Sequence, residues 1–166
     1  LYKKLKILRY SGTLSDPKKI VTNEAVHCSL NHKIDTMQAS MLLVMLKHLP
    51  ARMKRRKSIA KKYNNHLSKY ILCPNVEGPN KHALYTFAFQ TDHRDDLMQY
   101  LNDNNIETKI YHKPLVSDAP YLLKYKNSNF EEASKVLDRI LSIPCHEKLS
   151  DKQVDYVIDK IYRFFN

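Results

Sequence analysis

The chain has 166 residues, of which 43% are hydrophobic and 27% charged, and its formal net charge is +11. That length is enough for one compact domain with its own core, and the composition is that of a globular protein rather than a disordered one. No apolar run approaches the roughly 20 residues that cross a bilayer, so no membrane-spanning segment is predicted. Only two glycines occur, Gly12 and Gly78, which argues against a glycine-rich phosphate loop.

The net charge, the cysteines and the histidines indicate which binding partners and which cellular compartment suit this chain. The excess of 28 Lys and Arg over 17 Asp and Glu predicts an anionic partner, unless the lysines are simply spread over the surface. That partner could be a nucleic acid, a phosphorylated small molecule or a membrane surface. Cys28, Cys73 and Cys145 form no CxxC pair, so a reducing, cytoplasmic setting fits best. The eight histidines form no HxxxH or HExxH pattern, and no metal site is expected.

The first 69 residues are predicted to be mainly helical. The expected elements are a helix over 2–10, a loop over 11–33, a helix over 34–49 and a second long helix over 51–69. Asp35, three residues before Gln38, predicts the start of the first long helix. Residues between Leu42 and Leu46 are apolar nearly all round, so this helix is expected to contact more than one neighbour. Pro50 favours the first turn of a new helix.

The remaining residues are predicted to alternate strands with helices. Strands are expected over 84–91, 106–112 and 141–144, and helices over 92–104, 128–139 and 150–166. Asp92 is the expected cap of the first of these helices. Ser128 with Glu131, and Ser150 with Gln153, have capping-box spacing for the other two. The order β-α-β-α-β-α behind two long helices predicts an α+β fold, in which a small sheet-and-helix layer follows a helical connector.

Two stretches are candidates for function. The basic run RMKRRK (52–57) is predicted to be a solvated helix face, because a nucleic-acid site would want aromatic residues interleaved with the charge. In YHKP (111–114), Tyr111 and His112 end a predicted strand before a proline. Strand ends beside loops often carry working residues, although an ordinary strand terminus would look the same.

Five stretches in one order carry a family resemblance. They are LKILRYSGT (5–13), SLNHKIDTMQASMLLVMLKHL (29–49), RRKSIAKKYNNHL (55–67), LYTFAFQTDHRDDLMQYLNDNNIETKIYHKPL (84–115) and ILSIPCHEKLSDKQVDYVIDKI (140–161). Together they resemble the C-terminal half of the DegT/DnrJ/EryC1/StrS aminotransferases. Those are sugar aminotransferases with the aspartate aminotransferase fold (fold type I), and they use pyridoxal 5′-phosphate. The pattern N-x-[RK]-x-D-x-x-Q-A, followed by R-R-x-x-I-A-x-x-Y, is the most specific part of the likeness.

The resemblance implies a division of the chain and a set of site residues. Residues 1–69 would be the end of the cofactor domain with its connector helices, and residues 70–166 the small C-terminal domain. Asn31 is expected to reach the cofactor phosphate of the neighbouring subunit in a homodimer with a shared active site. Lys33 would lie near the substrate, where the family more often has Arg. Tyr111 and His112 would line the sugar pocket.

The resemblance also implies where this chain departs from the family. Ser29 stands where a glycine is usual, so the local turn is expected to differ. The lysine that forms the cofactor imine is expected upstream of residue 1, so the 166 residues would hold no catalytic residue and would be inactive by themselves.

The implied reaction is transfer of an amino group, with glutamate as the expected donor, to a keto sugar on a nucleotide. One alternative is a family member that dehydrates the sugar instead. Another is a free-standing basic helical module that binds nucleic acid with a steep dependence on salt.

Overall fold

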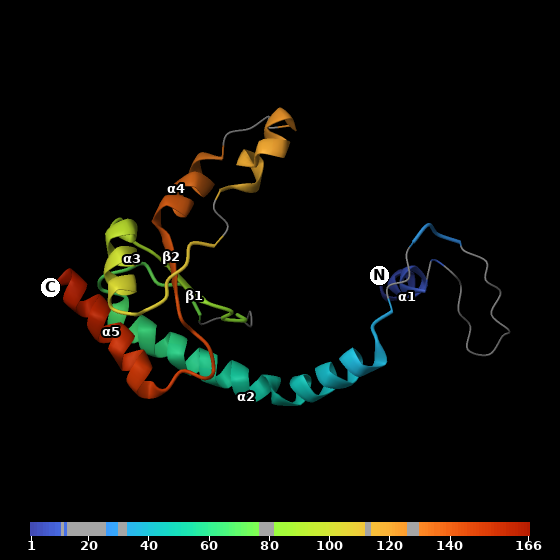
Figure 1. The fold of residues 1–166 in the computed structure, drawn as a ribbon, viewed down its shortest axis with the longest axis horizontal. Coiled ribbons are helices and arrows are strands. Elements are labelled where there is room, and N and C mark those ends of the chain that lie inside the picture. Colours follow the sequence, from blue (N-terminus) through green and yellow to red (C-terminus); the bar gives the residue numbers. More distant parts are fainter. Residues whose placement is uncertain (11, 13–25, 30–32, 77–81, 112–113, 126–129) are drawn as a thin grey trace. The chain divides into compact units, whose positions relative to one another are not determined.

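The computed structural model describes residues 1–10, 12, 26–29, 33–76, 82–111, 114–125 and 130–166, without the side chains of residues 121, 123 and 125. The chain divides into two compact units, Leu1–His48 and Leu49–Asn166, and each is described by itself. Figure 1 follows the elements along the chain. In the described part of the chain, no helix is both long and apolar enough to cross a bilayer.

The first unit begins with helix α1 (Tyr2–Arg9), as predicted. Gly12 follows it with a positive φ of 75°, and a side chain there would collide with the carbonyl oxygen of His27. The Gly12 N–H donates to the Ile7 carbonyl oxygen at 3.0 Å, which closes the turn after α1. The Ser29 hydroxyl donates to the Leu8 carbonyl oxygen at 2.8 Å, so this serine ties the segment before the next helix to α1.

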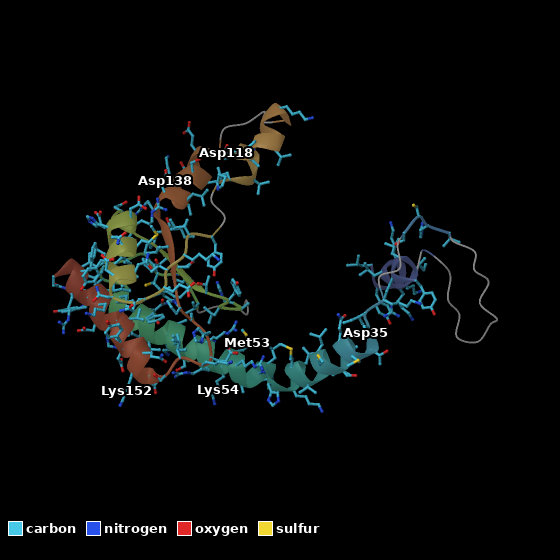
Figure 2. The ribbon with its side chains drawn as sticks, in the orientation of Figure 1. Asp35, Met53, Lys54, Asp118, Asp138 and Lys152 are labelled. Atoms are coloured by element: carbon cyan, nitrogen blue, oxygen red, sulfur yellow. The ribbon has the colours of Figure 1, made fainter. Side chains whose placement is uncertain are left out.

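Helix α2 (Thr36–Leu67) is one continuous helix, where the sequence had suggested two. The predicted cap is confirmed, because Asp35 Oδ1 accepts from the Met37 N–H at 2.8 Å and the Gln38 N–H at 3.4 Å. Asp35 marks this start in Figure 2. The predicted break at Pro50 is wrong. The proline has no N–H to donate within the helix, but the strong helix formers on both sides keep the backbone helical.

The part of α2 before Pro50 exposes most of its apolar side chains. Those more than two-fifths exposed are Met37, Met41, Leu42, Leu43, Val44, Met45, Leu46 and Leu49. In contrast, the part after Pro50 buries one side in the second unit through Ile59, Ala60, Tyr63 and Leu67. Residues 42–46 are apolar on every side of the helix, but the burial predicted for them is not found within the first unit, where their side chains are 47–62% exposed.

The sheet of the second unit is an antiparallel pair of strands, β1 (Phe87–Gln90) and β2 (Ile140–Ile143), with Phe87 opposite Ile143. The predicted strand over 106–112 is wrong. Within the described residues, that segment meets the sheet only at an isolated bridge between Lys109 and Ser142. Asn105 takes a positive φ of 58° before the segment, and Tyr111 lies in a turn after the bridge, so the ladder is not extended.

Three helices and two short 3-10 turns make up the other regular elements among the described residues of the unit. They are α3 (Arg94–Asp103), η1 (Val116–Asp118), η2 (Pro120–Tyr125), α4 (Glu131–Arg139) and α5 (Asp151–Phe165). The capping box of Ser150 and Gln153 is confirmed. The predicted Asp92 cap is wrong, because His93 precedes α3 and Asp92 instead pairs with Arg139 at 2.8 Å. Ser128, the other predicted cap, lies outside the described residues.

The core of the second unit lies where the sheet meets the second part of α2, α3 and α5 (Figure 1). Its largest fully buried side chains are Tyr63, Phe87, Phe89, Ile59, Leu67, Leu84, Leu97, Leu101, Leu141, Ile143, Ile161 and Val154. Tyr63 and Phe87 meet edge to face, with ring centroids 5.1 Å apart. Burying these side chains removes apolar surface from water, which is the main force that holds the layer together.

Candidate active-site pocket

Tyr111 lies against a second tyrosine, Tyr85, which no sequence motif pairs with it. The rings of Tyr85 and Tyr111 meet edge to face, with centroids 5.9 Å apart and an interplanar angle of 64°. The Lys109 ammonium lies 5.1 Å from the centroid of the Tyr111 ring. The pKa of Tyr111 is raised above its ordinary value, first by a hydrogen bond with Tyr85, and further by desolvation and the nearby charge of Glu107. Tyr111 therefore remains a neutral phenol well above neutral pH.

These residues border a pocket of about 230 Å³ beside the sheet, near the start of β1 and the end of β2. Three segments contribute its polar lining. The first supplies Tyr85 and Thr86, the second supplies residues 107–109 and Tyr111, and the third supplies Ser142 and His146. Phenol, ammonium, carboxylate and imidazole groups together can both donate and accept hydrogen bonds. Such a lining suits a polar ligand with many hydroxyl groups.

A set of contacts from α2 holds the segment that carries His146. The Tyr63 hydroxyl donates to the Pro144 carbonyl oxygen at 3.1 Å, and the Cys145 thiol lies 3.7 Å from the Arg56 carbonyl oxygen. Burial raises the pKa of the Cys145 thiol to about 11, against the opposing effect of the nearby Arg56 charge. That thiol is neutral at physiological pH and is a packing group rather than a nucleophile.

The basic run 52–57 is only in part a solvated face. Lys54, labelled in Figure 2, and Lys57 are exposed, as predicted. Two arginines of the run, Arg55 and Arg56, instead contact other parts of the unit. Arg55 donates to the Leu149 carbonyl oxygen at 2.6 Å and pairs with a carboxylate near the start of α5. Arg56 pairs with Glu147 at 2.9 Å. For these two arginines the predicted solvated face is wrong, because acidic groups some 90 residues later fold back onto α2.

The remaining predicted site residues are Lys33, Asn31 and His112, and the structure describes only Lys33. Lys33 is exposed in the first unit, and its ammonium lies 4.0 Å from the centroid of the Tyr10 ring. Asn31 and His112 lie outside the described residues. Lys33 and Tyr111 belong to different units, so each is placed only within its own. Among the described residues, no group of three His, Cys, Asp or Glu side chains could hold a metal ion.

Comparison with known proteins decides which family this arrangement belongs to. The model of the DegT/DnrJ/EryC1/StrS aminotransferase family matches residues 1–162. The chain belongs to this family. Members of the DegT/DnrJ/EryC1/StrS family are pyridoxal-phosphate-dependent sugar aminotransferases, and the predicted membership is confirmed.

Individual relatives agree with the family match. The chain is 31% identical over 137 residues to the spore coat polysaccharide biosynthesis protein SpsC of Bacillus subtilis, covering 75% of this chain and 35% of the relative. It is 24% identical over 165 residues to the dTDP-3-amino-3,6-dideoxy-alpha-D-galactopyranose transaminase of Aneurinibacillus thermoaerophilus. That match covers 99% of this chain and 44% of the relative. The chain thus spans less than half the length of these relatives.

The fold comparison confirms the predicted α+β class. The structure is similar to that of a DegT DnrJ EryC1 StrS aminotransferase from Brucella abortus, with a TM-score of 0.85 and 26% identity. The match covers 97% of this chain and 42% of that one. The described residues of this chain therefore share their fold with the matched part of that aminotransferase.

Sequence reasoning missed Tyr85, Lys109 and His146 as neighbours of Tyr111. One local signal could have directed attention to Tyr85, since it occurs in a short aromatic run, LYTFAF, directly before the core of β1. No local pattern could have brought in His146, because it reaches the pocket only through the folding of β2 against β1.

Proposed function

We propose that the protein transfers an amino group from glutamate to a keto sugar carried by a nucleotide, with pyridoxal 5′-phosphate as cofactor. The observation that carries the proposal is the family match over residues 1–162. A transaminase acting on a nucleotide-linked amino sugar is among the relatives, which supports a substrate of that class. The +11 charge suits the diphosphate of such a substrate.

The chain's own groups near Asn31 fit the phosphate of the cofactor. An exposed ammonium, that of Lys33, follows Asn31 by two residues, and an Asn amide adds two N–H donors. The two N–H donors can bind a phosphate oxygen, and the nearby ammonium adds positive potential without itself having to contact the phosphate. When bound, pyridoxal phosphate supplies the electron sink for moving the amino nitrogen. We assign Asn31 to the cofactor phosphate of the partner subunit in a homodimer, and Lys33 to the substrate.

The pocket beside Tyr111 is proposed to receive the sugar. Tyr85 and Tyr111 offer ring edges and phenol oxygens, while Lys109 and His146 add polar groups within the same pocket. His112, the next residue along the chain, is assigned to the same pocket. Sugar rings present both hydroxyl groups and C–H surfaces, and a lining of phenols and charged groups can contact both kinds.

The three free cysteines are consistent with a reducing, cytoplasmic setting.

The ion pairs of the basic run argue against the alternative function, that of a module that binds nucleic acid. The two arginines of the basic run that would bind phosphates, Arg55 and Arg56, already pair with Asp151 and Glu147. Their charge is largely neutralised within the unit. Nonspecific affinity for a duplex should therefore be weak, with only a shallow dependence on salt.

The test is a transamination assay on the protein that contains this chain, supplied with pyridoxal phosphate, glutamate and a keto nucleotide-sugar. The expected result is formation of the amino sugar and of 2-oxoglutarate in equal amounts. Loss of water from the sugar, without glutamate consumption, would instead identify a dehydratase. Tight, salt-dependent binding of a DNA duplex without either reaction would overturn the proposal.

A further inference from the structure

We propose that Tyr10 is a positioning residue for Lys33. Its ring holds the Lys33 ammonium in a cation–π contact and so limits where that charge lies before the substrate binds. The proposal rests on the proposed function, in which Lys33 contacts the nucleotide sugar. The site residues expected from the sequence did not include Tyr10, which only the structure brings to Lys33.

The contact between the Lys33 ammonium and the Tyr10 ring is a close one. The ammonium nitrogen lies 4.0 Å from the ring centroid. A cation within about 6 Å of an aromatic ring face is attracted by the negative charge density of that face. The other lysine–tyrosine contacts found among the described residues are longer, at 5.1 to 5.5 Å. The Lys33 ammonium is therefore held more closely than the other lysines in this part of the chain.

The backbone that carries the Tyr10 ring belongs to a closed turn after α1. The Tyr10 N–H donates to the Ile7 carbonyl oxygen at 3.0 Å, and the Gly12 N–H donates to the same oxygen at 3.0 Å. The Gly12 carbonyl oxygen in turn accepts from the N–H groups of Val26 and His27, at 2.9 Å and 3.3 Å. The Tyr10 ring thus starts from a fixed backbone, while 38% of the residue stays exposed to solvent and to a ligand.

Lys33 lies between two anchored points of the first unit. On one side the Ser29 hydroxyl donates to the Leu8 carbonyl oxygen at 2.8 Å, and on the other Asp35 caps α2. These anchors do not fix the exposed Lys33 ammonium, because a lysine carries its charge on a long flexible stem. The Tyr10 ring gives that charge a preferred place.

Holding the ammonium before the substrate arrives should strengthen binding. Part of the conformational entropy that a lysine side chain loses on binding is then already lost in the free protein. An ammonium has several N–H donors, and those directed away from the ring can still donate to a substrate oxygen. An exposed cation–π contact of this kind is worth about a two- to fivefold change in affinity. The expected effect is therefore modest and lies in KM rather than in kcat.

The first experiment measures the contact by NMR in the 166-residue chain. Lysines labelled with ¹³C at Cε would be observed in the wild type and in Lys33→Arg, which identifies the Lys33 signal. Protons above an aromatic ring face are shifted upfield by the ring current. The Lys33 Hε signals should move downfield in Tyr10→Leu, which removes the ring, and should stay in place in Tyr10→Phe, which keeps it. Unchanged Lys33 signals in Tyr10→Leu would overturn the proposal, whatever the protein catalyses.

The matched control for this experiment is a second lysine–tyrosine pair on α1. The Lys6 ammonium lies 5.5 Å from the centroid of the Tyr2 ring, and Tyr2 is 72% exposed. Tyr2→Leu should leave the Lys33 signals unchanged. If Tyr2→Leu moves them as far as Tyr10→Leu does, the shift reports a general change in the first unit and the proposal fails.

The second experiment measures steady-state kinetics of the enzyme that contains this chain. Tyr10→Leu should raise KM for the nucleotide sugar by about two- to fivefold and leave kcat unchanged. Tyr10→Phe should restore the wild-type KM, and Tyr2→Leu should not change it. The double variant of Tyr10→Leu with Lys33→Gln should be no worse than Lys33→Gln by itself, since Tyr10 acts through Lys33.

The positioning role and the proposed function fail in different ways. If Lys33→Gln raises KM for the sugar and Tyr10→Leu does not, Tyr10 is no positioning residue although the proposed site stands. If the Lys33 signals move in Tyr10→Leu but neither variant changes KM, the assignment of Lys33 to the sugar is wrong, and the positioning role is lost with it. A rise in KM for Tyr10→Phe equal to that for Tyr10→Leu would assign the effect to the hydroxyl group and would also overturn the proposal.

Discussion

Arg56 and Glu147 lie 91 residues apart in the sequence, and Arg56 Nε donates to Glu147 Oε2 at 3.0 Å. A second guanidinium nitrogen of Arg56 lies 2.9 Å from the same oxygen. Arg52 reaches the other carboxylate oxygen at 3.8 Å. This acidic group therefore joins α2 to the segment that leads into α5. Ion pairs that are half shielded from water are worth more than fully exposed ones.

Acid should weaken the protein in part through Glu147. Its pKa is lowered, first by a backbone hydrogen bond and then by the side-chain hydrogen bond with Arg56. Because the folded-state pKa is below the ordinary value of 4.5, the carboxylate stabilises the fold above that pH. The contribution is lost as the pH falls through the folded-state pKa. Glu147→Gln should lower the unfolding midpoint near neutral pH and leave less further loss on acidification, as measured by urea unfolding across pH.

The matched control for Glu147 is Glu132→Gln. Glu132 pairs with Lys135 at 2.7 Å, three residues along the exposed side of α4. An exposed pair of this kind contributes little, so this variant should change the free energy of unfolding by less than about 0.5 kcal/mol. If both variants showed the same pH dependence as the wild type, the Glu147 pair would not stabilise the fold.

Removing one hydroxyl from the core should be costly. Tyr63 is fully buried, burial raises its pKa, and its O–H donates to the Pro144 carbonyl oxygen at 3.1 Å. Tyr63→Phe leaves that carbonyl group without its donor, so the free energy of unfolding should fall by about 1–3 kcal/mol. Tyr162→Phe, at an exposed position on α5, should change it by less than about 0.5 kcal/mol. Equal effects of the two variants in urea unfolding would contradict the assigned role of the hydrogen bond.

The exposed apolar side of α2 should bind hydrophobic dyes. Leu43 and Leu46 are 62% and 57% exposed and belong to a run of apolar residues before Pro50. Contiguous apolar surface of this kind promotes self-association and dye binding. Replacing both leucines by lysine should lower dye fluorescence and the apparent mass in solution. Val136→Lys on α4 is the control and should change neither. A monomeric wild-type chain that ignores the dye would contradict the prediction.

Tyr111 and His112 should matter to turnover rather than to stability. Tyr111 borders an open pocket, and truncation there leaves no buried cavity. Tyr111→Phe and His112→Ala should lower the rate of amino-sugar formation in the complete enzyme with little change in unfolding. If either variant costs several kcal/mol, on the order of the 2–5 kcal/mol of a core deletion, it removes a packing residue and the assignment fails.

Asn31 should act on the cofactor held by the partner subunit. In the complete dimer, Asn31→Ala should weaken cofactor retention by roughly 1.5–3 kcal/mol, the worth of one hydrogen bond to a charged group. A hybrid dimer with one mutated subunit should show the defect in the active site of the unmutated subunit. Unchanged cofactor affinity, or a loss confined to the mutated subunit's own site, would refute the role in trans.

The sequence by itself determined the features of this protein that depend on a few neighbouring residues or on a repeating spacing of residue types. Ser150 and Gln153 form the predicted capping box because both partners lie within one helical turn. Asp35 caps α2 for the same reason. The family motifs were equally readable, because their residue types and spacing are properties of the linear chain. By contrast, Pro50 was misjudged, since the helix formers on either side outweigh the missing donor.

Only the tertiary structure decided the pairings between distant segments. Residues 106–112 have the alternation of a strand, yet a ladder needs a neighbour in register, and the described segment finds one only at Lys109. Tyr85 meets Tyr111, and Arg56 meets Glu147, because the fold of the sheet and of the segment before α5 brings their backbones together. Contacts of this kind depend on the packing of the whole unit, which no short stretch of sequence encodes.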